Sequence, residues 1–131
     1  MLKRALEDLD SELAAYRKLS GMLDEQFQTA KRLDTTSLVQ VGDAIAQEVA
    51  RLDQRRRARM QLLHVATTLA NRLPAAKSKL ARQALEKRCA ELKQLAMQCK
   101  ASTLRNGQLL ASQYDIMQRV LRGEQHTYAP G

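Results

Sequence analysis

The sequence predicts an all-α protein in which three long antiparallel helices form a coiled-coil-like bundle, with the third helix the longest and overhanging the others. Three observations support this prediction. The 131 residues include only two prolines and five glycines, aromatic residues make up 3%, and apolar residues recur at spacings of three and four over long stretches. Strand-forming aromatic and β-branched runs are lacking, which argues against a sandwich, a barrel or an α/β enzyme. We therefore expect a single helical domain over residues 1–131.

The first predicted helix covers about residues 2–33. Charged residues of both signs lie between its apolar positions, as on a solvated helix face. The pattern stops near Leu33, and Ser37 with Gln40 three residues later is typical of a capping box, so a second helix is predicted from about residue 38. The apolar seam of the first helix consists of Leu2, Leu6, Leu9, Leu13, Tyr16, Leu23, Phe27 and Ala30.

The second predicted helix covers about residues 38–70 and the third about residues 74–122. Pro74 suits a first helical turn, because its missing N–H is not needed there, and Gly123 is a candidate C-cap, with residues 123–131 as a flexible tail. The seam of the second helix consists of Leu38, Val41, Ile45, Val49, Leu52, Met60, Leu63 and Leu69. That of the third consists of Leu80, Leu85, Cys89, Leu92, Leu95, Cys99, Leu109, Leu110, Met117, Val120 and Leu121.

Helix length predicts an exposed apolar segment. At about 1.5 Å per residue the first two helices span roughly 50 Å each and the third roughly 73 Å. Short connections make the helices antiparallel neighbours, so the third helix should overhang by about residues 110–122. Exposed apolar surface of this kind commonly marks a binding site. The apolar side chains of the segment are Leu110, Ile116, Met117, Val120 and Leu121.

Polar or small residues occupy the third seam just before this segment, at Thr103, Asn106 and Gln113, next to Gly107. Glycine inside a helix costs roughly 1 kcal/mol relative to alanine. One hypothesis is therefore a hinge at Asn106–Gly107 that lets the end of the helix fold onto a partner. The alternatives are an ordinary surface glycine and a kink that packs the end back on the bundle.

Residues for catalysis or metal binding are sparse. His64 and His126 lack further ligands at helical metal-site spacing, and no glycine-rich phosphate loop or nucleophile elbow is present. Cys89 and Cys99 would lie about 15 Å apart on one helix, too far for a disulfide between them. We therefore expect no enzymatic activity, no cofactor, no small-molecule substrate and no metal site.

The charge is uneven. The formal net charge is +8, and residues 72–122 alone carry eleven basic and three acidic side chains. Arg51, Arg55 and Arg59 add an i,i+4 stripe on the second helix. A nucleic-acid-binding helical protein is one interpretation, but aromatic residues for base stacking are lacking; a solvated face or an acidic protein partner is the other. Without a signal peptide or an apolar run long enough for a membrane helix, a cytoplasmic protein is expected.

The carboxy-terminal part of the sequence resembles a known family. Residues 104–110 (LRNGQLL) and 127–131 (TYAPG) are similar to an N-G-x-L-[LI] element and a tail T-x-Y-G-x-x-G-like element of the FlgN family of flagellar export chaperones. Ala129 stands where the family has a glycine. The resemblance implies a cytosolic chaperone of flagellar type III export that binds the hook–filament junction proteins FlgK and FlgL and keeps them unassembled until export.

The resemblance also implies sites. Tyr128 corresponds to the tail tyrosine that is associated in the family with docking to the export gate FlhA, which is where contact with the membrane apparatus would occur. The client-binding residues would be Asn106, Gly107, Leu109, Leu110, Ile116, Met117, Val120 and Leu121.

Two further interpretations remain open. A basic coiled-coil component of the export ATPase complex, similar to FliJ, would explain the charge better. A self-associating coiled coil, in which the overhang buries itself in a dimer, is the simplest structural alternative.

Overall fold

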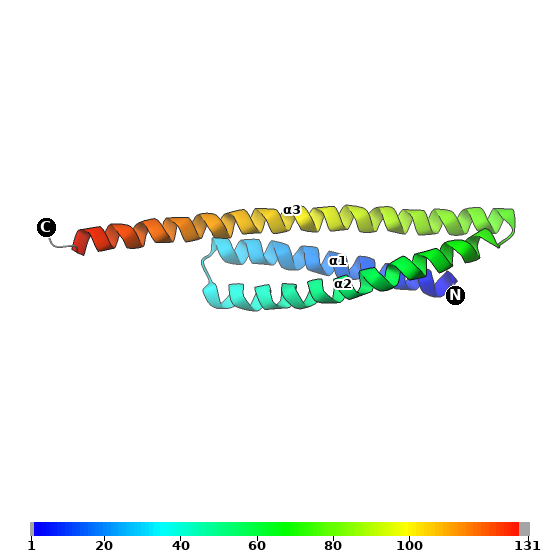
Figure 1. The fold of residues 1–131 in the computed structure, drawn as a ribbon, viewed down its shortest axis with the longest axis horizontal. Coiled ribbons are helices and arrows are strands. Elements are labelled where there is room, and N and C mark those ends of the chain that lie inside the picture. The colour runs from blue at the N-terminus through cyan, green and yellow to red at the C-terminus, as the bar shows by residue number, and fades with distance from the viewer. Residues whose placement is uncertain (1, 129–131) are drawn as a thin grey trace.

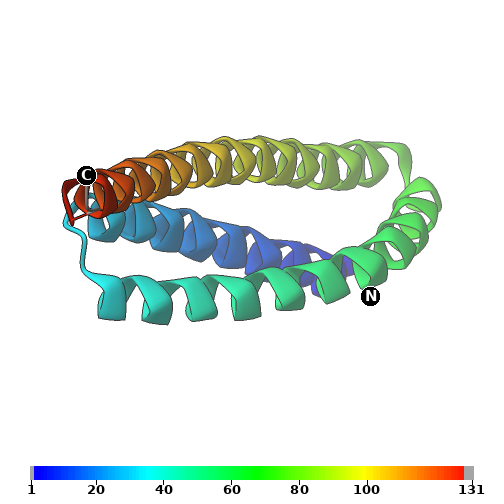
Figure 2. The same cartoon turned by 60° about the vertical axis from the view of Figure 1, so that its left-hand side comes forward.

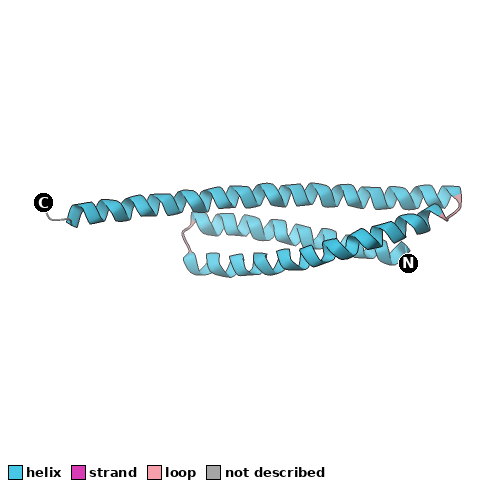
Figure 3. Cartoon of the chain, in the orientation of Figure 1, coloured by secondary structure: helices cyan, strands magenta, loops and turns pink. Residues whose placement is uncertain are grey.

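Three helices make up the described chain, as predicted. The computed structural model describes residues 2–128, with side chains described up to Gly123. The helices are α1 (Leu2–Lys31), α2 (Thr35–Asn71) and α3 (Ala75–Tyr128), and two short turns connect them (Figures 1 and 3). Residues 2–128 contain no strand, so the all-α prediction is confirmed.

Each helix runs in the opposite direction to the one before it, so the chain crosses the length of the molecule three times (Figure 1). Helices α1 and α3 are parallel, because their cross-helix pairs rise together in number: Arg88 with Asp10, then Arg105 with Asp24. Helix α1 lies between the other two and packs against both, whereas α2 and α3 contact one another much less. Figure 2 shows the amino-terminal half of α2 apart from α3, and its other end rising toward the start of α3.

The apolar core consists of two clusters that both depend on α1. The first joins α1 to the end of α2 and the start of α3, and comprises Ala5, Leu9, Leu13, Ala66, Ala70, Leu85 and Leu92. The second lies further along α1 and comprises Leu19, Leu23, Leu52 and Cys99. Each fully buried leucine contributes about 1.5–3 kcal/mol. The seam predicted for the first helix is thus confirmed at most of its positions.

The predicted seam of the second helix is wrong at two positions. Val49 and Met60 are 48% and 69% exposed, while Glu48, Ala66 and Ala70 are buried. Next to Val49, Glu48 takes the inward position and its carboxylate pairs with Lys18 of α1. Next to Met60, Arg59 takes it and pairs with the buried carboxylate of Glu12. Leu80 of α3 is also exposed, at 68%.

The turn between α1 and α2 is a Schellman motif, in which Asp34 N donates to Thr29 O and Leu33 N donates to Ala30 O. Leu33 adopts the left-handed conformation there, with φ 58°. The cap predicted at Ser37 is wrong: Asp34 is the N-cap of α2, and both Ser37 N and Ser37 Oγ donate to its carboxylate at 3.1 and 2.7 Å. These hydrogen bonds hold the pKa of Asp34 below its usual value.

Helix α3 begins as predicted but ends later. Pro74 O accepts from Ser78 N at 2.8 Å, so the proline immediately precedes the first turn. Gly123 is not a C-cap, because the helix continues to Tyr128; Glu124 and Gln125 are strong helix formers and offset its low propensity. The predicted flexible tail is therefore helical over 123–128, and residues 129–131 lie outside the described residues.

Asn106 and Gly107 do not interrupt α3. Asn106 is buried, and its Nδ2 donates to Leu23 O and to Gln26 Oε1, both at 2.8 Å. Arg105 lies over the ring of Phe27, 4.1 Å from its centroid, beside this contact. Gly107 faces solvent in an unbroken helix, and a Cβ added there would meet open space. The structure thus favours an ordinary surface glycine over a hinge.

Substitutions at these neighbouring positions should have opposite effects. We expect Asn106→Ala to lower the free energy of unfolding by about 1–3 kcal/mol, because it removes the hydrogen bonds to Leu23 O and Gln26 Oε1 and leaves a void at a buried position. Gly107→Ala should raise it by up to about 1 kcal/mol through helix propensity. Urea denaturation followed by circular dichroism measures both. A destabilising Gly107→Ala would show that the helix needs glycine there.

Candidate functional site

The candidate site lies where α3 outruns its neighbours. The last hydrogen bond between α3 and α1 runs from Gln113 Nε2 to Ala30 O, at 2.8 Å, one residue before α1 ends at Lys31. Residues 114–128 of α3 continue past this point, which at about 1.5 Å per residue amounts to roughly 22 Å. The overhang therefore begins at Tyr114, four residues later than the sequence indicated.

The described part of the overhang is rich in exposed apolar side chains. Neither α1 nor α2 extends alongside them, because α1 ends and α2 begins before this part of α3 (Figure 1). Exposed apolar side chains that lie close together on one helix are unfavourable in water, and they commonly mark an interaction site. The exposed fractions are 65% for Tyr114, 55% for Ile116, 61% for Met117, 55% for Val120 and 47% for Leu121.

An open groove of about 550 Å³ runs along the base of the overhang. One wall is α3, and the other is the end of α1 with the turn into α2. Its lining is almost entirely apolar, and Lys31 is the one charged residue among the lining side chains. The lining comprises Ala30, Lys31, Leu33, Thr35, Leu38, Gln113, Tyr114, Ile116, Met117 and Val120.

The structure separates the predicted client-binding residues into two groups. Ile116, Met117 and Val120 line the groove, and Leu121 is exposed beside it. Leu109 and Leu110 are half-buried against the bundle, Asn106 is buried, and Gly107 is exposed on α3 before the overhang. Tyr128 is the last residue of α3, and its side chain lies outside the described side chains.

Sequence reasoning missed the second wall of the groove. Leu33 is 67% exposed and Leu38 is half-buried, and both lie in or beside the turn that faces Met117. The apolar pattern marked Leu33 only as the end of a seam and Leu38 only as a seam position. Leu33 directly precedes Asp34, the N-cap of α2, and a leucine at an exposed turn position could have suggested a binding role. Which part of α3 it faces, however, depends on the register of the bundle.

Two charged side chains near the groove are held by contacts on their own helices. Arg119 Nη2 pairs with Asp115 Oδ2 at 2.9 Å on the outer side of the overhang. Lys31 Nζ lies over the ring of Phe27, 5.3 Å from its centroid. The groove therefore offers an apolar floor with little fixed charge, which suits an apolar helix face better than a polar ligand.

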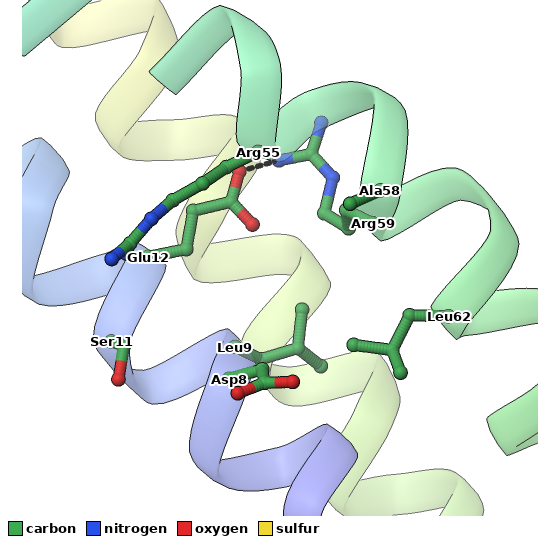
Figure 4. Close-up of a pocket in the computed structure, with 8 residues that line it drawn as sticks. All are labelled: Asp8, Leu9, Ser11, Glu12, Arg55, Ala58, Arg59 and Leu62. Carbon is green, nitrogen blue, oxygen red and sulfur yellow. Dashed lines mark hydrogen bonds and ion pairs between the residues drawn. The ribbon is translucent and has the colours of Figure 1, made fainter. Parts of the chain in front are cut away.

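A second hollow, of about 340 Å³, lies between α1 and α2 (Figure 4). Its central feature is the ion pair between Glu12 and Arg59, and Arg55 lines the same hollow. Burial raises the pKa of Glu12 above its usual value, and the positive charges of Arg59 and Arg55 oppose that shift. Because its buried acid already has a basic partner, the hollow resembles a structural ion pair more than a reactive site.

The cysteines and the potential metal ligands among the described residues do not form a reactive site. Burial raises the pKa of both free thiols, Cys89 and Cys99, above the usual range, so both stay protonated near neutral pH. Within the described part of the chain, no three His, Cys, Asp or Glu side chains come together to hold a metal ion. None of the described helices is long and apolar enough to cross a bilayer.

Comparison with known families agrees with this geometry. The family described as FlgN protein matches residues 1–127, nearly the whole chain. The chain belongs to the FlgN family. Its general role is therefore that of a flagellar export chaperone that binds export substrates. The predicted family is confirmed, and residues 128–131 of the tail element lie beyond the matched range. The chain matches no curated protein and no solved structure significantly.

The Glu12–Arg59 pair of this FlgN protein gives a stability test. Arg59→Ala leaves a buried carboxylate without its partner and should lower the free energy of unfolding by about 3 kcal/mol. Since Arg59 also holds the pKa of Glu12 down, that pKa should rise further in the variant, and a carboxyl with a raised folded-state pKa loses stability as pH rises through it. Urea denaturation should show a variant that is closer to wild type at pH ~5 than at pH ~7.

The double variant Glu12→Leu/Arg59→Leu is the control. It removes both charges and should recover most of the loss, with no pH dependence of its own from this site. If Arg59→Ala were equally destabilised at both pH values, the buried carboxylate would not be the cause.

Proposed function

We propose that this FlgN protein acts in flagellar type III export as the chaperone of the hook–filament junction proteins FlgK and FlgL, and that it binds them at the α3 overhang. The observation that carries the proposal is the exposed apolar groove beyond Gln113, which the chain's own α1 and α2 leave open. A client segment that covered this groove would be kept from premature assembly. The protein would work in the cytoplasm, before its client reaches the export apparatus.

The shape of the groove favours an amphipathic helix as the bound segment. The overhang supplies Ile116, Met117 and Val120 at spacings of one, three and four residues, which is one face of a helix. A client helix that lay along this face would continue the bundle where α1 ends. Met117 suits more than one client, because an unbranched thioether side chain repacks easily.

The left-handed Leu33 gives independent support. A non-glycine residue in this conformation costs roughly 1–2 kcal/mol, and glycine is the common residue at this position of a Schellman motif. The bundle gains little from the leucine side chain, which is 67% exposed and lines the groove. Strained backbone conformations are found preferentially at functional sites, so an exposed leucine in this conformation supports a binding role.

Two further assignments belong to the same proposal. Tyr128, at the end of α3, would dock the loaded chaperone to the export gate FlhA, away from the client groove. The protein would act without catalysis and without a cofactor, because holding a client needs binding energy alone.

Substitution of the groove residues should abolish client binding without unfolding the chain. We expect Met117→Asp/Val120→Asp to weaken binding of purified FlgK and FlgL by roughly tenfold or more, because carboxylates placed in an apolar contact must be desolvated. Leu80→Asp is the matched control, since Leu80 is an equally exposed apolar residue of the same helix. Isothermal titration calorimetry gives the affinities and circular dichroism the helix content. Unchanged affinity in the double variant would contradict the site.

Leu33→Gly separates stability from binding. Removal of the left-handed leucine should raise the free energy of unfolding by about 1 kcal/mol. The same change removes one wall of the groove and should weaken client binding. Thermal denaturation and calorimetry measure the two effects on one variant. A gain in stability with full client affinity would remove Leu33 from the site.

A further inference from the structure

A second uncharged stripe runs along the outer face of α3, away from the bundle. Its members follow the four-three spacing of a coiled-coil seam, and all of them are exposed. They are Ala90, Gln94, Met97, Ala101, Leu104, Gln108 and Ala111. The next positions of this spacing, Lys87 on one side and Asp115 on the other, are charged, so the neutral stripe has definite ends.

An exposed helix face normally carries charged residues, whereas this stripe of α3 carries none. The outward face of α1 carries Glu7 and Glu25, as expected for a solvated helix. On α3, by contrast, Met97 and Leu104 are 63% and 59% exposed. A shallow depression of about 490 Å³ also lies along the stripe from Ala90 to Ala101. The alanines permit another helix to approach closely, while Met97 and Leu104 supply apolar contact.

The charges beside the stripe determine what can pack there. Along one edge stand Lys93 and Lys100, and neither forms an ion pair within the described residues. Along the other edge, Glu91 and Arg105 already pair with Arg17 and Asp24 of α1. The uncompensated charge at the stripe is therefore positive.

A second copy of the chain does not fit this edge. In a parallel pair of α3 helices the residue opposite Lys100 is Arg105 of the other copy, five positions further along. In an antiparallel pair centred on Ala101, Lys100 faces Lys100. Both arrangements oppose like charges, whereas glutamate or aspartate in a partner helix would be attracted.

We propose that the outer stripe of α3, from Ala90 to Ala111, docks an amphipathic helix of another protein whose apolar seam is flanked by carboxylates. The stripe faces away from the core and is separate along α3 from the groove at Met117 and Val120. It therefore serves a partner other than the client at the overhang, and the two sites can be occupied together.

Two synthetic peptides of about three heptads test the proposal on the full-length chain. Both carry leucine at the seam positions; one has glutamate and the other lysine at the flanking positions. We expect the glutamate peptide to bind and the lysine peptide not to bind, as measured by fluorescence anisotropy. Affinity for the glutamate peptide should fall from about 50 to about 500 mM salt, because added ions screen the lysines.

Variants locate the contact. Met97→Gln/Leu104→Gln should weaken binding of the glutamate peptide roughly tenfold, while Met60→Gln/Leu80→Gln, which alters equally exposed apolar residues elsewhere, should not. Lys93→Glu/Lys100→Glu should lose the glutamate peptide and gain the lysine peptide. Lys77→Glu/Lys79→Glu, at exposed positions before the stripe, is the charge-matched control and should behave like the wild type.

Three results would overturn the proposal: equal binding of the two peptides, binding of neither, or full affinity in the Met97→Gln/Leu104→Gln variant. Light scattering adds a fourth, a dimer of the wild type that the same variant dissolves, which would assign the stripe to a second copy. Calorimetry with FlgK and FlgL runs in parallel, and Met97→Gln/Leu104→Gln should keep the wild-type client affinity. Failure at the stripe is thereby distinguished from failure at the overhang groove.

Discussion

The register between α1 and α3 is the constraint on which the rest of the molecule depends. Asn106 and Gln113 donate hydrogen bonds to Leu23 O and Ala30 O, so the last two turns of α1 are tied to one defined part of α3. A buried polar residue in a helical seam specifies register, because any slip leaves it without partners. With this register fixed, everything in α3 beyond Gln113 must extend past the end of α1. The exposed groove is thus a consequence of polar contacts at its base and further back along α3.

Between the two core clusters, α1 and α2 meet through charged side chains. The two core clusters both rely on α1, and α2 buries no apolar side chain between Leu52 and Leu62, where Arg59 meets Glu12 instead. A buried ion pair of this kind contributes less net stability than apolar packing, but removal of one partner is costly. The pair therefore holds α2 in place by specificity of pairing more than by binding strength.

Surface features of α3 divide along its length. From Ala90 to Ala111 the outer face is uncharged and edged by Lys93 and Lys100. Past Gln113 the helix forms an apolar groove together with Leu33 and Leu38. A single helix of 54 residues can carry both, because a rod that buries one face leaves the opposite face available along its whole length. Length, more than any special residue, gives a small chaperone two separate surfaces.

The sequence by itself determined the all-α class, the three helices, the seam of α1, the family and the apolar content of the overhang, because helical periodicity and the motif in residues 104–110 are local properties. It misplaced Val49, Met60 and Leu80 as seam residues, the cap at Ser37 and the helix end at Gly123. Only the tertiary structure decided that Asn106 is buried and that Leu33 and Leu38 complete the groove. The physical reason is that periodicity defines faces within one helix, whereas the partner of each face is set by the register between helices, through contacts between residues about 80 positions apart.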